Sequence, residues 1–256
     1  MTTTFEVRAT DDQVRSFQAN GYLAIDQITT AEEIAKLREL YDKVMADASA
    51  WRLVYEGDER GGKDGDVIDQ VFLPELQAPE MGDTQYLRNA RAMAAQLLGV
   101  EDDDVTPGGL MLIYKPPTGG RAAPWHQDEA FWDDKNHLKC NSLSVWMPLD
   151  DVVVESGAMQ FLPGSHTNDV LRHRSEPGEP LFLDEEVDLS SAVACPLSAG
   201  GATFHHCRTL HHTARNTSGR PRRAMTTIFH GPHAARDVPL EKPWIKGLQA
   251  PRQFTR

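Results

Sequence analysis

The chain has 256 residues, with 26 lysines and arginines against 38 aspartates and glutamates, so its formal net charge is −12. Such an acidic composition repels phosphate backbones, which excludes nucleic acid and anionic membranes as expected partners. No apolar run approaches the roughly 18 to 20 residues that cross a bilayer, and residues 1–5 lack the pattern of a signal peptide, so we expect a cytoplasmic protein.

Three helices are predicted in the first part of the chain. Thr10–Gln13 and Thr30–Glu33 each have the form of a capping box, and the first helix is expected to end near Gly21. Apolar residues recur at three- and four-residue steps after the second box, which is typical of an amphipathic helix. A third helix is predicted over Gln85–Leu98, where it closes on Gly99.

Two segments among these helices are not helical. Tyr22–Ile25 is short and apolar and predicts a brief strand. Tyr55–Asp66 is rich in glycine and acidic residues and has too little apolar content to pack, so we expect a mobile loop there.

After Pro107 the sequence changes to short apolar or alternating runs, which are separated by turn residues. Short strands without intervening helices favour an antiparallel sandwich or barrel. We therefore expect a single domain over residues 1–256, with mainly helical support in 1–106, a β core in 107–230 and a tail in 231–256. The strand-length runs are Gly109–Tyr114, Ser142–Leu149, Ala158–Leu162, Val193–Leu197, Ala202–His205 and Ala224–Phe229.

The cysteines and histidines are distributed unevenly. Three cysteines without CxxC spacing argue against a disulfide framework and against a thiolate zinc site. All ten histidines lie at or after His126, and six of them fall between His205 and His233. This asymmetry points to the second half of the chain as the place to look for metal chemistry.

The tetrapeptide Trp125–Asp128 contains the first candidate ligands. On an extended chain the side chains of His126 and Asp128 project to the same side while Gln127 points away. An imidazole and a carboxylate suit a divalent first-row metal, and one more histidine would complete a facial triad that leaves three positions open on iron. The candidates for this third ligand are His205, His206, His211 and His212.

The residues themselves leave two choices open. Alternation along the strand that contains Phe204 allows either His205 or His206 to be structural or to lie close to the site. Arg222 and Arg223 begin a strand on which neighbours face opposite ways, so only one of them can face the site.

Several segments resemble the phytanoyl-CoA dioxygenase family of iron(II)- and 2-oxoglutarate-dependent oxygenases. The resemblance implies a mainly β fold with flanking helices, in which a double-stranded β-helix of the jelly-roll, cupin-like type forms the core and N-terminal helices pack on one sheet. The matching segments are QANGYLAI at Gln18–Ile25, MLIYKPP at Met111–Pro117, WHQD at Trp125–Asp128, SVWMPLDDVVVESGAMQFLPGSH at Ser144–His166 and LHHTARNTSGRPRRA at Leu210–Ala224.

The resemblance also implies roles for individual residues. His126, Asp128 and His211 would bind iron(II), and Arg222 would pair with the distal carboxylate of 2-oxoglutarate. In the family the second histidine and the arginine are eleven residues apart, and here 222 − 211 = 11. His212 and Arg223 have the same separation but do not fit the register of the RNTSGRPR segment.

Further positions are carried over from the family with less support from the residues. His212 stands where the family usually has glycine and Thr213 where it often has serine. Trp146 and Met111 could equally be core residues, and the residues after Asp128 could pack on a helix. Expected cosubstrate contacts are Trp146, Thr213, Met111 and Gln70, and expected substrate contacts are Glu129, Phe131, Trp132 and His212.

The implied activity uses Fe(II), 2-oxoglutarate and O2 to hydroxylate or otherwise oxidise an unactivated C–H bond of a small-molecule metabolite, with succinate and CO2 as co-products. The carboxylate of Asp128 argues against the related halogenases, which have a small residue there. Two alternatives are a non-redox metal-dependent cupin-like enzyme and an inactive metabolite-binding protein. Substrate selection is expected from Tyr55–Leu76 and from the insertion His166–Asp188, and the protein is expected to be a monomer or homodimer.

Overall fold

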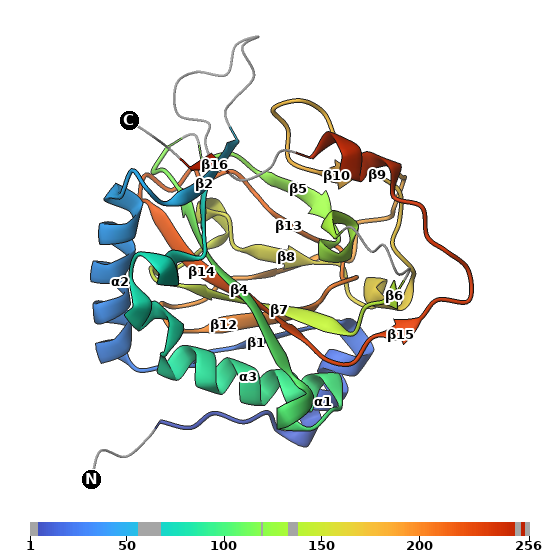
Figure 1. The fold of residues 1–256 in the computed structure, drawn as a ribbon, viewed down its shortest axis with the longest axis horizontal. Coiled ribbons are helices and arrows are strands. Elements are labelled where there is room, and N and C mark those ends of the chain that lie inside the picture. The colour runs from blue at the N-terminus through green and yellow to red at the C-terminus, as the bar shows by residue number, and fades with distance from the viewer. Residues whose placement is uncertain (1–4, 56–67, 119, 133–137, 249–251, 254–256) are drawn as a thin grey trace.

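Two antiparallel sheets enclose the interior of the molecule (Figure 1). The computed structural model describes residues 5–55, 68–118, 120–132, 138–248 and 252–253. The larger sheet has the strand order β1 (Tyr22–Ile25), β12 (Ala202–His206), β7 (Ser142–Pro148), β14 (Arg222–His230), β4 (Thr106–Lys115), β3 (Ile68–Phe72), β2 (Trp51–Tyr55) and β16 (Arg252–Gln253). The smaller sheet has the order β11 (Val193–Cys195), β8 (Met159–Phe161), β13 (His211–Thr213) and β5 (Ala123–His126).

Apolar side chains from both sheets meet in the interior. Trp146 and Ala224 of the larger sheet belong to one buried cluster with Met159 and Phe161 of the smaller sheet. Burial of such side chains is the main favourable term in folding, so this cluster holds the two sheets together. The arrangement confirms the predicted β fold with a double-stranded β-helix core.

Three helices cover the outer face of the larger sheet, as predicted (Figure 1). The hydroxyl of Tyr86 in the third helix donates to the backbone carbonyl of Val145 in β7 at 3.0 Å, which ties that helix to the centre of the sheet. The third helix has the predicted bounds. The helices are α1 (Asp11–Asn20), α2 (Ala31–Ala46) and α3 (Gln85–Leu98).

The helix ends follow the capping signals in the sequence, with one difference. Thr10 and Gln13 form the complete box at the start of α1, and Gly21 ends that helix in the left-handed region at φ 79°. Thr30 accepts from the N–H of Glu33 as predicted. The Glu33 carboxylate, however, accepts the backbone N–H groups at the start of α3, those of Gln85 (2.7 Å) and Tyr86 (2.8 Å). One acidic side chain thus joins two helices.

Several strands of the described residues were not expected, among them β2, β3, β5 and β13. β2 and β3 lie in the half predicted to be mainly helical, and they extend the larger sheet beyond β4. β5 and β13 are too short, at four and three residues, to show a period in the sequence. The predicted loop Tyr55–Asp66 falls outside the described residues except for its first position.

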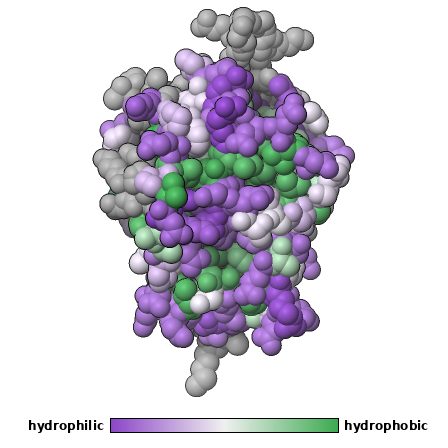
Figure 2. All heavy atoms as spheres, turned by 90° about the vertical axis from the view of Figure 1, so that its right-hand side faces the viewer, coloured by the Kyte–Doolittle hydropathy of each residue, from purple (hydrophilic) through white to green (hydrophobic). Residues whose placement is uncertain are grey.

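The C-terminal segment folds back on the core. Its β15 (Ala234–Ala235) pairs with β6 (Leu138–Lys139), and β9 (His173–Arg174) pairs with β10 (Phe182–Leu183) on the same side of the molecule (Figure 1). Figure 2 views this side and shows a band of hydrophobic residues bordered by hydrophilic ones. Within the described residues, none of the helices has the length and apolar content needed to span a bilayer.

Candidate metal centre and adjoining pocket

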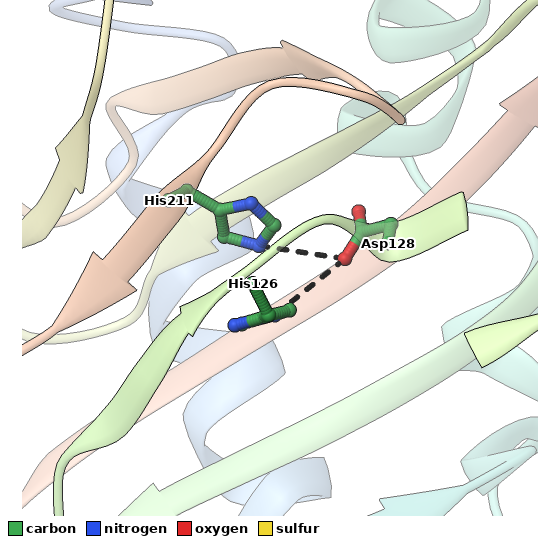
Figure 3. A group of neighbouring side chains, drawn as sticks. All are labelled: His126, Asp128 and His211. Carbon is green, nitrogen blue, oxygen red and sulfur yellow. Dashed lines mark ion pairs between the residues drawn. The ribbon is translucent and has the colours of Figure 1, made fainter. Parts of the chain in front are cut away.

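Two neighbouring strands of the smaller sheet bring three metal-binding side chains together. His126 ends β5 and lies opposite His211, which begins β13. Asp128 follows two residues after the end of β5, at the start of the short helix Asp128–Phe131. The ligand atoms lie within 4.8 Å of one another, with Asp128 Oδ1 at 3.4 Å from His211 Nε2 and 3.8 Å from His126 Nε2 (Figure 3).

Backbone carbonyls orient both imidazole rings. His126 Nδ1 lies 2.6 Å from the carbonyl oxygen of Pro124, and His211 Nδ1 lies 2.9 Å from that of Thr209. A carbonyl only accepts, so each Nδ1 carries a proton, which leaves Nε2 as the nitrogen available to a metal. Burial lowers the pKa of His126 to about 3, which keeps that ring neutral.

The two oxygens of the Asp128 carboxylate make different contacts. Oδ2 accepts hydrogen bonds from Ser144 Oγ and from His205 Nε2, the latter at 3.2 Å, while Oδ1 faces the two histidines. Although burial acts to raise it, the pKa of Asp128 is held well below its usual range by the neighbouring imidazoles. His206 is turned away, with its Nδ1 accepting from the backbone N–H of Arg208 at 3.1 Å. His205 is therefore the neighbour that supports the cluster.

Two imidazole nitrogens and one carboxylate oxygen at these separations fit a divalent metal such as iron(II). Nitrogen and oxygen donors of this kind form the facial triad of non-haem iron proteins, which leaves coordination positions for other ligands. The hydrogen bonds to each ligand fix its orientation, as is common around protein metal sites. His126, Asp128 and His211 are the candidate ligands.

Removing the Ser144 hydroxyl tests this support. In a Ser144→Ala variant, Asp128 Oδ2 loses a donor, and we expect the affinity for iron(II) to fall about 10-fold to 100-fold. Ser142→Ala is the matched control, because Ser142 lies two residues earlier on β7 but contacts His230 and His233 instead. Anaerobic iron titration should separate the two variants; equal affinities would contradict the role of Ser144.

A cavity of about 440 Å³ adjoins the three ligands. Apolar residues from both sheets and from the segments around them form much of its wall, including Leu53, Ile68, Phe72, Ile113, Ala123, Leu181 and Leu248. Most of the residues expected to contact cosubstrate or substrate line this cavity: Gln70, Met111, Phe131, Trp132, Trp146, His212, Thr213 and Arg222.

Arg222 is buried in this cavity and has unused hydrogen-bonding capacity. Its side chain is 1% exposed, its Nη1 donates to the carbonyl of Gly157 at 3.0 Å, and its Nε has no partner. The guanidinium carbon lies 5.4 Å from the ring centroid of Trp146. Burial lowers the pKa of Arg222 to about 10, so the group stays charged at neutral pH. Within the part of the chain that the structure describes, no carboxylate pairs with it.

Its neighbour Arg223 faces the other side of the strand. There its guanidinium forms ion pairs with Asp150 at 2.7 Å and with Asp42 at 3.1 Å, and Asp150 raises its pKa. The structure thus separates the two arginines as strand alternation requires, with Arg222 in the cavity.

His212 lies at the edge of the ligand cluster. Its ring stacks on Trp125 with centroids 5.3 Å apart, because alternation along β13 turns it away from the side occupied by His211. His212 lines the cavity as expected and is not one of the three clustered ligands.

The expectation that Glu129 faces substrate is wrong. Its side chain is fully buried, away from the cavity lining, and forms ion pairs with Arg208 and Arg236. The chain leaves the extended conformation at Asp128, so successive side chains no longer alternate between two faces. Both arginines are distant in sequence, so no local pattern shows this pairing.

The C-terminal segment clamps the turn that carries Asp128. Lys242 Nζ donates to the carbonyls of Glu129 (2.8 Å) and Trp132 (3.0 Å), and Trp244 Nε1 donates to that of Ala130 (2.9 Å). The segment predicted as a tail therefore contributes directly to the geometry of the site.

Lys115 lines the cavity but was not predicted to do so, although strand alternation indicates it. Met111, Ile113 and Lys115 lie at alternate positions of β4 and share the face that lines the cavity. Once Met111 is assigned to the site, the same alternation places Lys115 there. Ser144 and His205 could not be found this way, because their contacts with Asp128 depend on how the strands pair.

The fold and the cluster define a class: a double-stranded β-helix protein with a two-histidine, one-carboxylate cluster that could hold a metal. The chain belongs to the phytanoyl-CoA dioxygenase (PhyH) family, whose model matches residues 17–224.

Named relatives agree with this assignment. The probable alpha-ketoglutarate-dependent hypophosphite dioxygenase of Stutzerimonas stutzeri is 28% identical over 224 residues, which cover 84% of this chain and 76% of that protein. The structure of EvdO2 from Micromonospora carbonacea var. aurantiaca, complexed with 2-oxoglutarate, matches with a TM-score of 0.78 and 30% identity over 94% of this chain and 99% of that one. The epimerase SnoN, in complex with Fe3+, alpha ketoglutarate and nogalamycin RO, shares the fold at a TM-score of 0.66 and 23% identity, with 96% and 95% covered.

Proposed function

We propose that this protein is an iron(II)- and 2-oxoglutarate-dependent dioxygenase that oxidises an unactivated C–H bond of a small-molecule metabolite, with hydroxylation as the main outcome. One observation carries the proposal: a buried arginine, which has no carboxylate partner in the part of the chain that the structure describes, lines the same cavity as the His126, Asp128 and His211 cluster. A ligand that chelates metal at one end and carries a carboxylate at the other satisfies both features.

One end of the cavity binds the metal and the other end binds the distal carboxylate of 2-oxoglutarate. His126, Asp128 and His211 hold iron(II), which when bound supplies the activation of O2 coupled to decarboxylation of 2-oxoglutarate to succinate and CO2. Arg222 binds the distal carboxylate, since a guanidinium presents paired donors that match carboxylate geometry. Trp146 packs beside that guanidinium and limits its movement. Thr213, Met111 and Gln70 complete the cosubstrate side of the wall.

Aromatic residues bound the substrate side. Phe131 lies edge-on to the ring of His126, with centroids 5.4 Å apart, and Trp132 lines the same cavity. Together with Leu181 of the insertion these side chains exclude water from the metal-facing space, which protects reactive chemistry. The substrate is therefore a small molecule that enters past an apolar wall.

The competing functions account for less of this geometry. A non-redox cupin-like enzyme needs the three ligands but gives no role to a buried Arg222 that has no carboxylate partner among the described residues. An inactive binding protein needs neither the intact ligand set nor the hydrogen bonds that orient both histidines.

Domain organisation, location and assembly are part of the proposal. Residues from both flanks of the core, Gln70 and Leu248, line the same cavity beside the ligands, which supports a single oxygenase domain. The three cysteines are buried thiols, which fits the reducing cytoplasm. We expect a monomer or homodimer.

Oxygen-dependent succinate formation tests the function. Protein loaded anaerobically with iron(II) and 2-oxoglutarate should form succinate when O2 is admitted, and a metabolite extract should yield a product that gains one oxygen. Mass spectrometry and an oxygen electrode follow both events. Bound iron without oxygen-dependent succinate, with or without the extract, would favour a non-redox enzyme or an inactive binder.

Arg222→Ala should impair use of 2-oxoglutarate while iron binding is kept. Truncating one partner of a buried charge pair costs about 2 kcal/mol or more, so the KM for 2-oxoglutarate should rise about 30-fold or more. Arg223→Ala is the matched control, because its ion pairs with Asp150 and Asp42 lie outside the cavity. An unchanged KM in Arg222→Ala, or a larger rise in Arg223→Ala, would refute the role of Arg222.

A further inference from the structure

Two apolar clusters form part of the cavity wall beside the metal ligands. The first comes from β2, β3, β4 and β5, and the second joins the insertion, the short helix Asp128–Phe131 and the C-terminal segment. These segments are far apart in the sequence, so the tertiary fold brings their side chains to one space. The members that line the cavity are Leu53, Ile68, Phe72, Ile113 and Ala123 of the first cluster and Phe131, Leu181 and Leu248 of the second.

Charged side chains occupy other parts of the wall. In the described ranges of the chain, and with the histidines set aside, they are Lys115, Asp128 and Arg222. Asp128 belongs to the ligand cluster, while Lys115 lies opposite Arg222 in the register of β4 and β14, at the end that we assign to 2-oxoglutarate. The apolar part of the wall, as far as the structure describes it, therefore offers no charge to a second bound molecule.

A charged pair next to this wall is neutralised internally. Arg121 donates to the carboxylate of Glu179 and, at 3.1 Å, to the backbone carbonyl of Gly178. Gly178 and Glu179 directly precede Pro180 and Leu181, which line the cavity, whereas neither Arg121 nor Glu179 does. The pair thus fastens the insertion and leaves apolar side chains on the wall.

An ionised group placed between the two clusters would lose its hydration without gaining a partner, which is costly, whereas an apolar group gains by leaving water. We propose that the substrate is an uncharged, largely apolar metabolite that binds between the two clusters. A wall of this kind selects against phosphorylated, CoA-linked and zwitterionic compounds whose charge would enter it. The inference rests on the proposed function, because it takes the other end of the cavity as filled by 2-oxoglutarate, and it adds a substrate class.

The test compares three probes that share one bicyclic frame. At neutral pH 1-naphthylmethanol is uncharged, 1-naphthoate is an anion and 1-naphthylmethylammonium is a cation. Calorimetry under anaerobic conditions, on manganese(II)-loaded protein saturated with 2-oxoglutarate, measures the Kd of each, and the cosubstrate keeps the anion away from Arg222. The uncharged probe should bind about 10-fold or more tightly than either charged one.

Charged variants of the wall locate the probe. Leu248→Glu and Phe72→Glu each place a carboxylate on one cluster at a partly buried position, and each should improve binding of the cation relative to the uncharged probe about 10-fold or more. Using both clusters guards against one variant that fails to fold. Leu76→Glu is the control, because this leucine is 62% exposed and does not line the cavity, and it should leave all three Kd values unchanged.

A metabolite extract provides an independent readout. The compound that gains one oxygen should come from the fraction that passes both an anion and a cation exchanger. A product from a retained fraction would overturn the inference, as would equal Kd values for the three probes, tighter binding of a charged probe or no binding of the uncharged one. An unchanged preference in both Leu248→Glu and Phe72→Glu would overturn the placement between the clusters. Wild-type protein that neither binds 2-oxoglutarate nor forms succinate would instead refute the proposed function itself.

Discussion

Replacing His211 with alanine is expected to abolish tight iron(II) binding and, with it, succinate formation. The substitution removes one of three clustered ligands and leaves only His126 and Asp128. Loss of a supporting residue around a metal already costs about 10-fold to 100-fold in affinity, so loss of a ligand should exceed that range. Metal content after anaerobic loading and desalting measures the effect directly.

The adjacent histidine is the matched control. His212→Ala removes an imidazole of the same size one residue later, but that ring stacks on Trp125 outside the ligand cluster. This variant should retain one iron per chain. If His211→Ala kept its iron and His212→Ala lost it, the ligand assignment would pass to His212.

Replacing Glu129 with glutamine is expected to destabilise the fold strongly. The carboxylate is fully buried between Arg208 and Arg236, and its loss leaves two guanidinium groups facing a neutral amide. Breaking a buried charge pair in this way costs about 3 to 5 kcal/mol of unfolding free energy. Denaturant unfolding followed by circular dichroism should show a lower midpoint with an unchanged slope.

An exposed acidic residue provides the comparison. Asp12→Asn removes a surface ion pair with Arg15 and should change the unfolding free energy by about 1 kcal/mol or less. A Glu129→Gln variant as stable as Asp12→Asn would show that the buried pair contributes little. The variant should also bind iron more weakly, because the turn that carries Asp128 depends on this pairing.

The elements with local signals could be predicted closely from the sequence. α3 has the predicted bounds, because Thr84 supplies an N-cap and Gly99 ends the helix in the left-handed region at φ 69°. The longer core strands β4, β7, β12 and β14 were found within a few residues, since each shows an apolar or alternating run between turn residues. Where a residue served a distant partner, as Glu33 does for α3, local reading assigned it to the wrong contact.

The ligand set could be predicted only in part from the residues alone. His126 and Asp128 share a local spacing, but His211 was distinguished from its neighbours by family resemblance. The strand that presents it, β13, is three residues long and is defined by its pairing with β5 and β8. The burial of Glu129 and the support from His205 likewise arise from tertiary pairing, which leaves no local pattern.

The clamp formed by the hydrogen bonds of Lys242 and Trp244 determines when, during synthesis of the chain, the turn that carries Asp128 can be held in place. Asp128 leaves the ribosome more than a hundred residues before these side chains, yet they hold the carbonyls of the turn that positions it. The turn that carries Asp128 is therefore held in the geometry described above only after residues 242–244 have been synthesised.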